Sequence, residues 1–402
     1  MKFYTSVLPY RGKLLVRGIN QDGGRKKFRI PYKPSLFIPT QKESKYKTLD
    51  GRNVDKVTFD SISDTKRWIE EYKGVSNFEY FGNTRYQYPF IADEFPDKID
   101  WDIKQIRILT IDIECESENG FPDPDKAEEP LICITVKDHE KKNIKVFGMG
   151  NFVNDRDDVD YIKCSSEIDL VHRFTDFWCK YNPDIITGWN VKFFDIPYLM
   201  NRFRYLMGDE YILQFSPWGV VSEGTALALG YNRTQKYWDI MGVSTLDYLD
   251  LYRKHTFVRR ESYKLDYIGE VELGENKLDN PYDTFKEFYS KDHQLFVEYN
   301  IQDVELVDKL EDKMQLIALH LTMAYEAKVN YQDVFGQVRV WDTIIYNHLR
   351  DKNIVPPAMQ ETKSSEGFEG AYVKDPVVGF HDWICSFDLN SLYPHLIMQY
   401  NI

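Results

Sequence analysis

The sequence predicts an α/β fold, and three observations lead to this class. The stretch from Ile106 to about Glu116 is strongly strand-like, with apolar residues along most of its length. Residues 166–178 carry apolar side chains at helical spacing behind Ser166, which can cap a helix. Strands and helices then alternate as far as residue 317, which is typical of a mixed sheet flanked by helices.

Other elements follow from local patterns. Residues 1–104 read as short strands and turns, with a hairpin turn at Gln21–Lys27. Residues 150–160 form a polar loop. We further expect a strand at 184–187, a helix from Asp195 to Met207 with Pro197 in its first turn, and a long helix from Ser290 past Lys313.

The composition is that of a globular protein, and 402 residues suffice for two or three domains. Five cysteines without a Cys-x-x-Cys pair indicate neither a disulfide framework nor a zinc site. They favour a reducing cytoplasm, that of the host cell if the protein is viral. Because the N-terminus has no signal-peptide pattern and no run of about 18 apolar residues exists, we expect no membrane span.

The net charge of −13 argues only weakly against a nucleic-acid partner, because a site that binds metal ions itself requires carboxylates. Two basic clusters with interleaved aromatic residues occupy residues 25–33 and 253–264. Each could contact phosphates, but a solvated surface remains the simpler explanation of either cluster alone.

Two carboxylates share one face of the strand at 106–116. Side chains alternate along a strand, so Asp112 and Glu114 lie on the same side, roughly 7 Å apart. Like charges at that distance repel unless a cation lies between them, and a divalent metal ion would serve. A solvent-facing acidic edge is the alternative.

Two further acidic positions follow at helices. Asp195 precedes Pro197 where a helix should begin, a place where an N-cap would also explain it. Tyr299 and Asp303 lie four residues apart on one helical face that is otherwise apolar. Such a pair is also common on protein surfaces.

In this order, the Asp-Ile-Glu of the strand, Asn-x-x-x-Phe-Asp and Tyr-x-x-x-Asp resemble the three exonuclease motifs of the DEDD superfamily, in its tyrosine-bearing subgroup. The resemblance implies an RNase H-like fold and a 3′→5′ exonuclease. It also implies five catalytic residues, four of which are metal ligands, with tyrosine as the fifth: Asp112, Glu114, Asp195, Asp303 and Tyr299.

Phosphodiester hydrolysis needs an activated water and relief of charge on the leaving 3′ oxygen, which two divalent ions held by carboxylates supply. Mg²⁺ or Mn²⁺ suits an all-oxygen site. In the family pattern Asp112 bridges both ions, Glu114 and Asp195 support one each, and Asp303 holds the ion that activates water. Tyr299 orients the water or the scissile phosphate.

The end of the chain resembles motif A of family B DNA polymerases, which follows an exonuclease domain in that family. The matching stretch is Phe-Asp-Leu-Asn-Ser-Leu-Tyr-Pro, from Phe387 to Pro394. The resemblance implies a metal ligand in Asp388 and an incoming-nucleotide site at Asp388, Leu392 and Tyr393. His395 departs from the usual Pro-Ser-Ile continuation without touching the ligand.

Other residues are DNA-binding candidates by the same resemblance. Gly370 and Tyr372 belong to a stretch similar to the segment that links exonuclease and palm, where template passes. Asn190 and Phe194, beside Asp195, could hold the terminal base and sugar. Residues 217–244 occupy the place of a β-hairpin in polymerases of T-even-like bacteriophages, with Gly230 and Asn232 expected near its tip; a core hairpin of the exonuclease sheet is the alternative.

The resemblance divides the chain into an N-terminal domain at 1–104, completed by 318–365, an exonuclease domain at 105–317, and a linker with the start of the palm at 366–402. The second metal-binding segment and the fingers motif of family B are absent from the sequence, so we expect no polymerisation by this chain alone. It would be a shortened chain or half of a split polymerase.

The predicted function is therefore proofreading, with single-stranded and primer–template DNA and a C-terminal polymerase half as partners. The alternative is a non-catalytic half that grips DNA or assists assembly. A free-standing RNA exonuclease fits less well, because it would not carry motif A.

Overall fold

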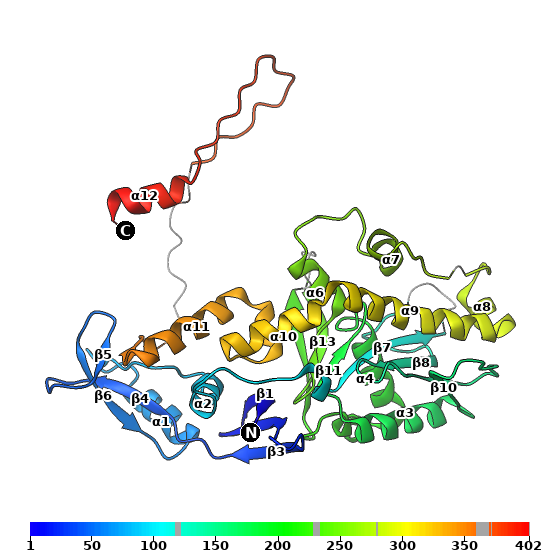
Figure 1. Ribbon diagram of the computed structural model, residues 1–402, viewed down its shortest axis with the longest axis horizontal. Coiled ribbons are helices and arrows are strands. Elements are labelled where there is room, and N and C mark those ends of the chain that lie inside the picture. Colours follow the sequence, from blue (N-terminus) through cyan, green and yellow to red (C-terminus); the bar gives the residue numbers. More distant parts are fainter. Residues whose placement is uncertain (117–121, 228–233, 279, 359–369, 371, 402) are drawn as a thin grey trace. The chain divides into compact units, whose positions relative to one another are not determined.

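The computed structural model describes residues 1–116, 122–227, 234–278, 280–358, 370 and 372–401. Contacts divide the chain into two units, Met1–Met359 and Gln360–Ile402, with the predicted exonuclease residues in the first. The first unit combines sheets with helices on both sides (Figure 1), which confirms the α/β class.

The N-terminal part of the first unit holds two small sheets. In one, β1, β2 and β3 pair antiparallel, and β2 and β3 form the predicted hairpin. Its turn spans residues 20–24, since the predicted turn residues 25–27 already belong to β3. In the other, β15 from much later in the chain lies parallel to β5. The strands are β1 Phe3–Tyr10, β2 Lys13–Ile19, β3 Arg25–Ile30, β4 Ser35–Pro39, β5 Tyr46–Thr48, β6 Asn53–Thr58 and β15 Ile354–Val355.

This region also contains helices that the sequence interpretation missed when it assigned only strands and turns. Helix α1 (Ile62–Tyr72) begins after Ser61, whose hydroxyl accepts a hydrogen bond from the Asp64 amide. Helix α2 (Gln87–Glu94) has no side-chain cap. Both are short, with 11 and 8 residues, so each offers few turns over which a helical period can be recognised in the sequence.

The central sheet of the first unit has six strands in the order β10-β9-β8-β7-β11-β14. Its middle strand β7 pairs antiparallel with β8 and parallel with β11. These strands are β7 Ile108–Cys115, β8 Leu131–Asp138, β9 Ile144–Gly148, β10 Val159–Lys163, β11 Ile185–Thr187 and β14 Ser244–Thr245.

The two faces of β7 pack against different helices. Leu109, Ile111 and Ile113 join a core with helices α3 (Glu167–Tyr181) and α4 (Asp195–Met207). Helix α9 (His293–Met314) lies on the other side of the sheet (Figure 1). The alternation predicted from the sequence therefore separates an apolar face from the face that carries Asp112 and Glu114.

The helix boundaries agree with the predictions at α3 and α4 and differ at α9. Ser166 caps α3 by accepting from the Asp169 amide, as predicted. The helix expected to run on from Ser290 is instead broken at Asp292, which ends α8 (Phe285–Lys291) and caps α9 by accepting from the Leu295 amide. The polar loop ends at residue 158, because β10 begins at Val159.

Segment 217–244 forms a hairpin of β12 (Val221–Leu227) and β13 (Thr234–Ile240), with Glu223 opposite Trp238. Within the described part of the chain its two strands pair with one another alone, so the hairpin is not part of the six-stranded sheet. Trp238 and Ile240 nevertheless pack into the core beside α4. Gly230 and Asn232, expected near the tip, lie outside the described residues.

The remaining helices of the first unit connect or cover these sheets. Their bounds are α5 Asp209–Ile212, α6 Tyr248–His255, α7 Leu265–Leu273, α10 Leu316–Ala327, α11 Gln337–Asp351, and the short 3₁₀ turns Ile103–Gln105, Leu213–Phe215 and Tyr331–Phe335.

In the second unit, the described residues form one helix, α12 (Leu392–Tyr400), preceded by an irregular stretch.

Candidate active site

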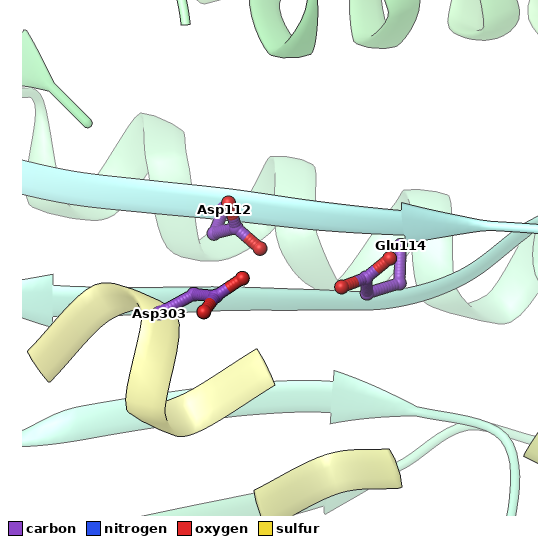
Figure 2. A group of neighbouring side chains, drawn as sticks. All are labelled: Asp112, Glu114 and Asp303. Carbon is purple, nitrogen blue, oxygen red and sulfur yellow. The ribbon is translucent and has the colours of Figure 1, made fainter. Parts of the chain in front are cut away.

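Three of the four predicted exonuclease carboxylates converge. Asp112 and Glu114 project from β7 toward Asp303 on α9 (Figure 2). One carboxylate oxygen from each lies within 4.8 Å of the other two. Strand β7 is internal to the sheet, so the acidic-edge alternative is wrong. Asp303 is only 4% exposed, which also rules out a surface pair with Tyr299.

Asp195 lies where β7 and β11 separate. Strand β11 pairs with β7 only as far as Thr110, so Ile113 has no partner in β11. Asp195 Oδ1 accepts a hydrogen bond from the amide of Ile113 at 3.1 Å. The N-cap is Phe194, so Asp195 is the first residue within α4 and the N-cap alternative is wrong. Its carboxylate is not in the group formed by the other three.

A buried aspartate holds the loop that leads to Asp195. Asp247 accepts hydrogen bonds from the amides of Asn190 and Lys192 at 3.0 and 2.9 Å. At the start of this loop, Gly188 has a φ of 155°, and a Cβ there would collide with the carbonyl oxygen of Ile111. Glycine therefore lets the loop pass close to β7. Asn190, a DNA-binding candidate, lies in this loop with a left-handed φ of 66°.

The carboxylates raise each other's pKa values. Burial is the main cause of the raised pKa of Asp112, and the charges of Asp303, Asp195 and Glu114 add to it. Burial and Asp303 raise the pKa of Glu114 to about 8. Burial raises the pKa of Asp195 to about 8, against the opposing effect of its backbone hydrogen bonds. Ionising all of them requires a compensating positive charge.

Lys277 supplies positive charge to this cluster. Its ammonium group forms an ion pair with Asp303 and donates a hydrogen bond to the Tyr299 hydroxyl at 3.4 Å. Burial opposes the charged form, but Asp303, Tyr299 and Asp112 together raise the pKa of Lys277 above its ordinary value. Burial raises the pKa of Tyr299 to about 12, so its phenol is neutral near pH 7.

The donor set fits hard divalent cations. All three converging groups are carboxylates, which are the ligands that Mg²⁺ and Mn²⁺ prefer. Asp303 Oδ1 is buried and has no hydrogen-bond partner among the described residues. An unpaired buried acceptor of this kind is costly, and coordination to a cation would satisfy it. Asn300 meanwhile donates to Asp112 Oδ2 at 2.5 Å, which orients that side chain.

We predict that the metal-free chain loses stability between about pH 4.5 and pH 8. In this window folded Glu114, with its pKa of about 8, keeps a proton that the unfolded chain has released. The folded state therefore binds more protons, and its stability falls as pH rises. Mn²⁺ binds the ionised form, so it should raise the melting temperature more at pH 8 than at pH 6.

Thermal unfolding in EDTA and in Mn²⁺ at both pH values measures this effect. Glu114→Gln, which has no proton to lose at this position, should make the pH dependence in EDTA less steep and reduce the shift caused by Mn²⁺. Part of the dependence should remain, because the pKa of Asp195 is also about 8. A melting temperature in EDTA that is the same at pH 6 and pH 8 would contradict the prediction.

The predicted polymerase residues lie in the second unit and are exposed. Tyr372 is 88% exposed, and Leu392 and Tyr393 lie at the start of α12. Gly370 and Asp388 precede this helix in irregular chain. Among the described residues, Asp388 belongs to no cluster of three possible metal ligands. The metal and nucleotide roles of this set stay predictions.

Comparison with known proteins identifies the family. The exonuclease domain of DNA polymerase family B matches residues 80–268, and the family's polymerase domain matches residues 333–402. The DNA-directed DNA polymerase of Escherichia phage RB69 is 32% identical over 432 residues, which cover all of this chain and 47% of that protein. The chain belongs to DNA polymerase family B.

Two further relatives have sequences similar to all or most of this chain. The DNA-directed DNA polymerase of Enterobacteria phage T4 is 32% identical over 427 residues, covering the whole chain and 47% of that protein. The DNA polymerase catalytic subunit of Alcelaphine herpesvirus 1 is 29% identical across 76% of the chain and 30% of its own length. The chain spans about half the length of the two phage relatives.

This family B chain contains site residues that the sequence interpretation missed. Lys277, Asn300 and Asp247 all contact the predicted residues or their backbone. A single lysine in a loop, or an Asn beside Tyr299, belongs to no sequence pattern that would mark it as a site residue. No helix in the described part of the chain is long and apolar enough to cross a bilayer.

Proposed function

We propose that this chain carries the 3′→5′ proofreading exonuclease of a family B DNA polymerase, in an RNase H-like domain built on the six-stranded sheet. The observation that carries the proposal is the convergence of Asp112, Glu114 and Asp303, with a buried Asp303 oxygen that lacks a partner. A non-catalytic binding half would have no use for such a costly cluster.

Asp112, Glu114 and Asp303 would hold divalent ions, with Asp195 as the fourth ligand of the proposed site. When bound, two such ions lower the pKa of a water molecule and stabilise charge on the attacking and leaving oxygens. The two carboxylates of β7 that would hold these ions, Asp112 and Glu114, lie in the C-terminal half of that strand. Asn300 keeps the Asp112 carboxylate oriented through its amide hydrogen bond.

Tyr299 and Lys277 would act on the scissile phosphate. Because Lys277 donates to the phenol oxygen of Tyr299, the Tyr299 proton remains available for a phosphate oxygen or for the water. The ammonium group of Lys277 lies beside the same oxygen and can attract the phosphate. Asn190, which lies in the loop before Asp195, and Phe194, the N-cap of α4, would hold the terminal nucleotide.

The proposed substrate is the 3′ end of DNA, with primer–template DNA and a C-terminal polymerase half as partners. Gly370 and Tyr372 would contact template, and Asp388, Leu392 and Tyr393 would contribute to nucleotide binding in a completed polymerase site. The similarity to phage DNA-directed DNA polymerases supports these assignments.

We expect 5′-labelled single-stranded DNA to shorten from its 3′ end with Mg²⁺ and to stay intact with EDTA. Matched duplex ends should be degraded more slowly, because unpairing bases costs a few kcal/mol, and mismatched ends should fall between. Gel electrophoresis of DNA and RNA substrates measures all three rates. Cleavage that persists in EDTA, or degradation of RNA alone, would refute the proposal.

Deleting residues 226–234 should slow the digestion of duplex ends and spare single strands. The base of the β12–β13 hairpin is anchored, because Trp238 is buried and Arg204 pairs with Glu223 at 2.6 Å. Trp238 is therefore unavailable for stacking on bases, and strand separation would depend on other residues of the hairpin. Loss of both activities would instead mean that the whole hairpin is structural.

A further inference from the structure

A basic cleft lies at the end of the central sheet away from Glu114. Its volume is about 930 Å³, within the range of small-molecule sites in proteins. It is lined by the start of β7, the adjoining ends of β8 and β9, and the last turns of α3. Leu109 points into this region from the face of β7 opposite Asp112, so the cleft is separate from the carboxylate cluster.

The charge of the cleft is opposite to that of the protein. Seven lining residues are Lys or Arg and three are Asp or Glu, in a chain whose net charge is −13. Several of these cations are neutralised, as Lys145 is by Asp160. Lys104, Lys141 and Lys180 are exposed and form no ion pair among the described residues. Three free ammonium groups around one cleft favour a polyanion.

The walls of the cleft also contain aromatic rings. The rings of Phe177 and Tyr181 stack with centroids 5.6 Å apart, and the Arg107 guanidinium lies 5.9 Å from the Tyr181 ring. Both aromatic residues line the cleft and are only partly buried. An aromatic and guanidinium surface of this kind is suited to a flat heterocycle.

The amide oxygens of two side chains in the lining accept no hydrogen bond from the described residues. Gln105 Oε1 and Asn143 Oδ1 are buried and unpartnered among the described residues. The Gln105 amide is oriented, because its Nε2 donates to Asp102 at 3.1 Å. A ligand N–H that reached either oxygen after a small side-chain movement would satisfy a costly acceptor.

We propose that this cleft binds a nucleotide, with the phosphates at Lys104, Lys141 and Lys180 and the base against Phe177 and Tyr181. A base supplies both the flat ring and the N–H donors, and the phosphate supplies the negative charge. The nucleotide is either a free nucleoside triphosphate or one unit of a single strand that passes across this face.

Calorimetric titration of the full chain in EDTA tests the proposal and separates the two sources. The probes are ATP, a single-stranded oligonucleotide, and inorganic triphosphate. Either ATP or the oligonucleotide should bind, and the tighter of the two identifies the source. Inorganic triphosphate should bind at least tenfold more weakly, because it has no base.

The variant Lys141→Ala/Lys180→Ala should raise the Kd by about tenfold or more. Its matched control is Lys56→Ala/Lys66→Ala, two exposed lysines of the N-terminal region, which should leave the Kd unchanged. Equal Kd values for both double variants, or binding that Asp112→Asn abolishes, would overturn the proposal. So would the absence of binding by either nucleotide probe.

Photolabelling of the unmodified chain with 8-azido-ATP or an azido-substituted oligonucleotide gives a second measurement that does not depend on any variant folding. The label should appear in the peptide that contains Phe177 and Tyr181. Labelling confined to other peptides would overturn the assignment even if binding is seen.

Discussion

Replacing Asp112 by Ala should lower the rate of 3′→5′ DNA degradation by about a thousandfold or more while the chain stays folded. Metal ions contribute several kcal/mol to stabilising the transition state, and each 1.36 kcal/mol is a factor of ten in rate. Asp112 belongs to the cluster, in which one of its carboxylate oxygens lies within 4.8 Å of oxygens of both Glu114 and Asp303. Asp303→Ala should have an effect of similar size.

The fold should tolerate Asp112→Ala because the carboxylate is a source of repulsion in the metal-free protein. Burial and three neighbouring carboxylates raise its pKa, so its removal relieves unfavourable charge. Among the described residues, it also breaks the hydrogen bond from Asn300 and removes a favourable charge interaction with Lys277. Circular dichroism should therefore show unchanged helix content, with a melting temperature at pH 8 no lower than that of the unmodified chain.

A matched control lies on the same helix as Asp303. Asp312 is an exposed acidic residue that pairs with Lys142 at 2.9 Å, so Asp312→Ala should leave the rate unchanged. Tyr299→Phe should cause a loss smaller than that of Asp112→Ala, because it removes a hydroxyl and no metal ligand. Undiminished degradation by folded Asp112→Ala protein would refute the site assignment.

The sequence predicts those parts of the site that depend on local periodicity. The period of two in a strand places Asp112 and Glu114 on one face whatever surrounds the strand, and that placement is confirmed. A helix period likewise places Tyr299 and Asp303 on the same side of α9 as buried Leu306 and Leu310. The capping role of Ser166 is equally local and is also confirmed.

Features that depend on tertiary contact were not predictable in this way. Asp195 reads as an N-cap in isolation, but its carboxylate serves the Ile113 amide, 82 positions away, because β11 ends early. Lys277 meets Asp303 only because the loop after α7 folds back onto α9. No spacing in the sequence signals such a pairing.

The contacts of the basic cluster at residues 25–33 were likewise not predictable from the sequence. A solvated surface was the simpler explanation, and Lys33 does pair with Asp60 at the surface. Arg25, however, contacts the fully buried Asp184, and Lys27 lies 5.7 Å from the ring of Trp218. Part of a run that looks like one charged surface therefore holds the N-terminal sheet against the central sheet.

Asp184→Ala should destabilise the first unit by about 3–5 kcal/mol, the range for removing one partner of a buried ion pair. Its carboxylate accepts hydrogen bonds from the Thr5 hydroxyl at 3.0 Å and the Arg107 amide at 2.9 Å. It also forms ion pairs with Arg17 at 3.2 Å and with Arg25. The side chain of Asp184 is 0% exposed and that of Arg17 is 4% exposed.

The cost arises because Arg17 cannot escape to water when its carboxylate is removed. Its guanidinium is surrounded by carbonyl groups, including that of Pro183 at 2.9 Å, which accept hydrogen bonds but carry no compensating charge. Asp184→Asn should recover part of the loss, since it keeps the shape and some hydrogen bonds. Urea unfolding followed by tryptophan fluorescence measures the free energy of unfolding of both variants. Asp312→Ala is the control for an exposed ion pair, and we expect it to cost at most about 1 kcal/mol. If Asp184→Ala costs no more than that control, the charges joining β2 and β3 to the central sheet are not what holds the two sheets together. The apolar core that β1 and β2 share with Ile108 and Ile185 of the central sheet must do so instead.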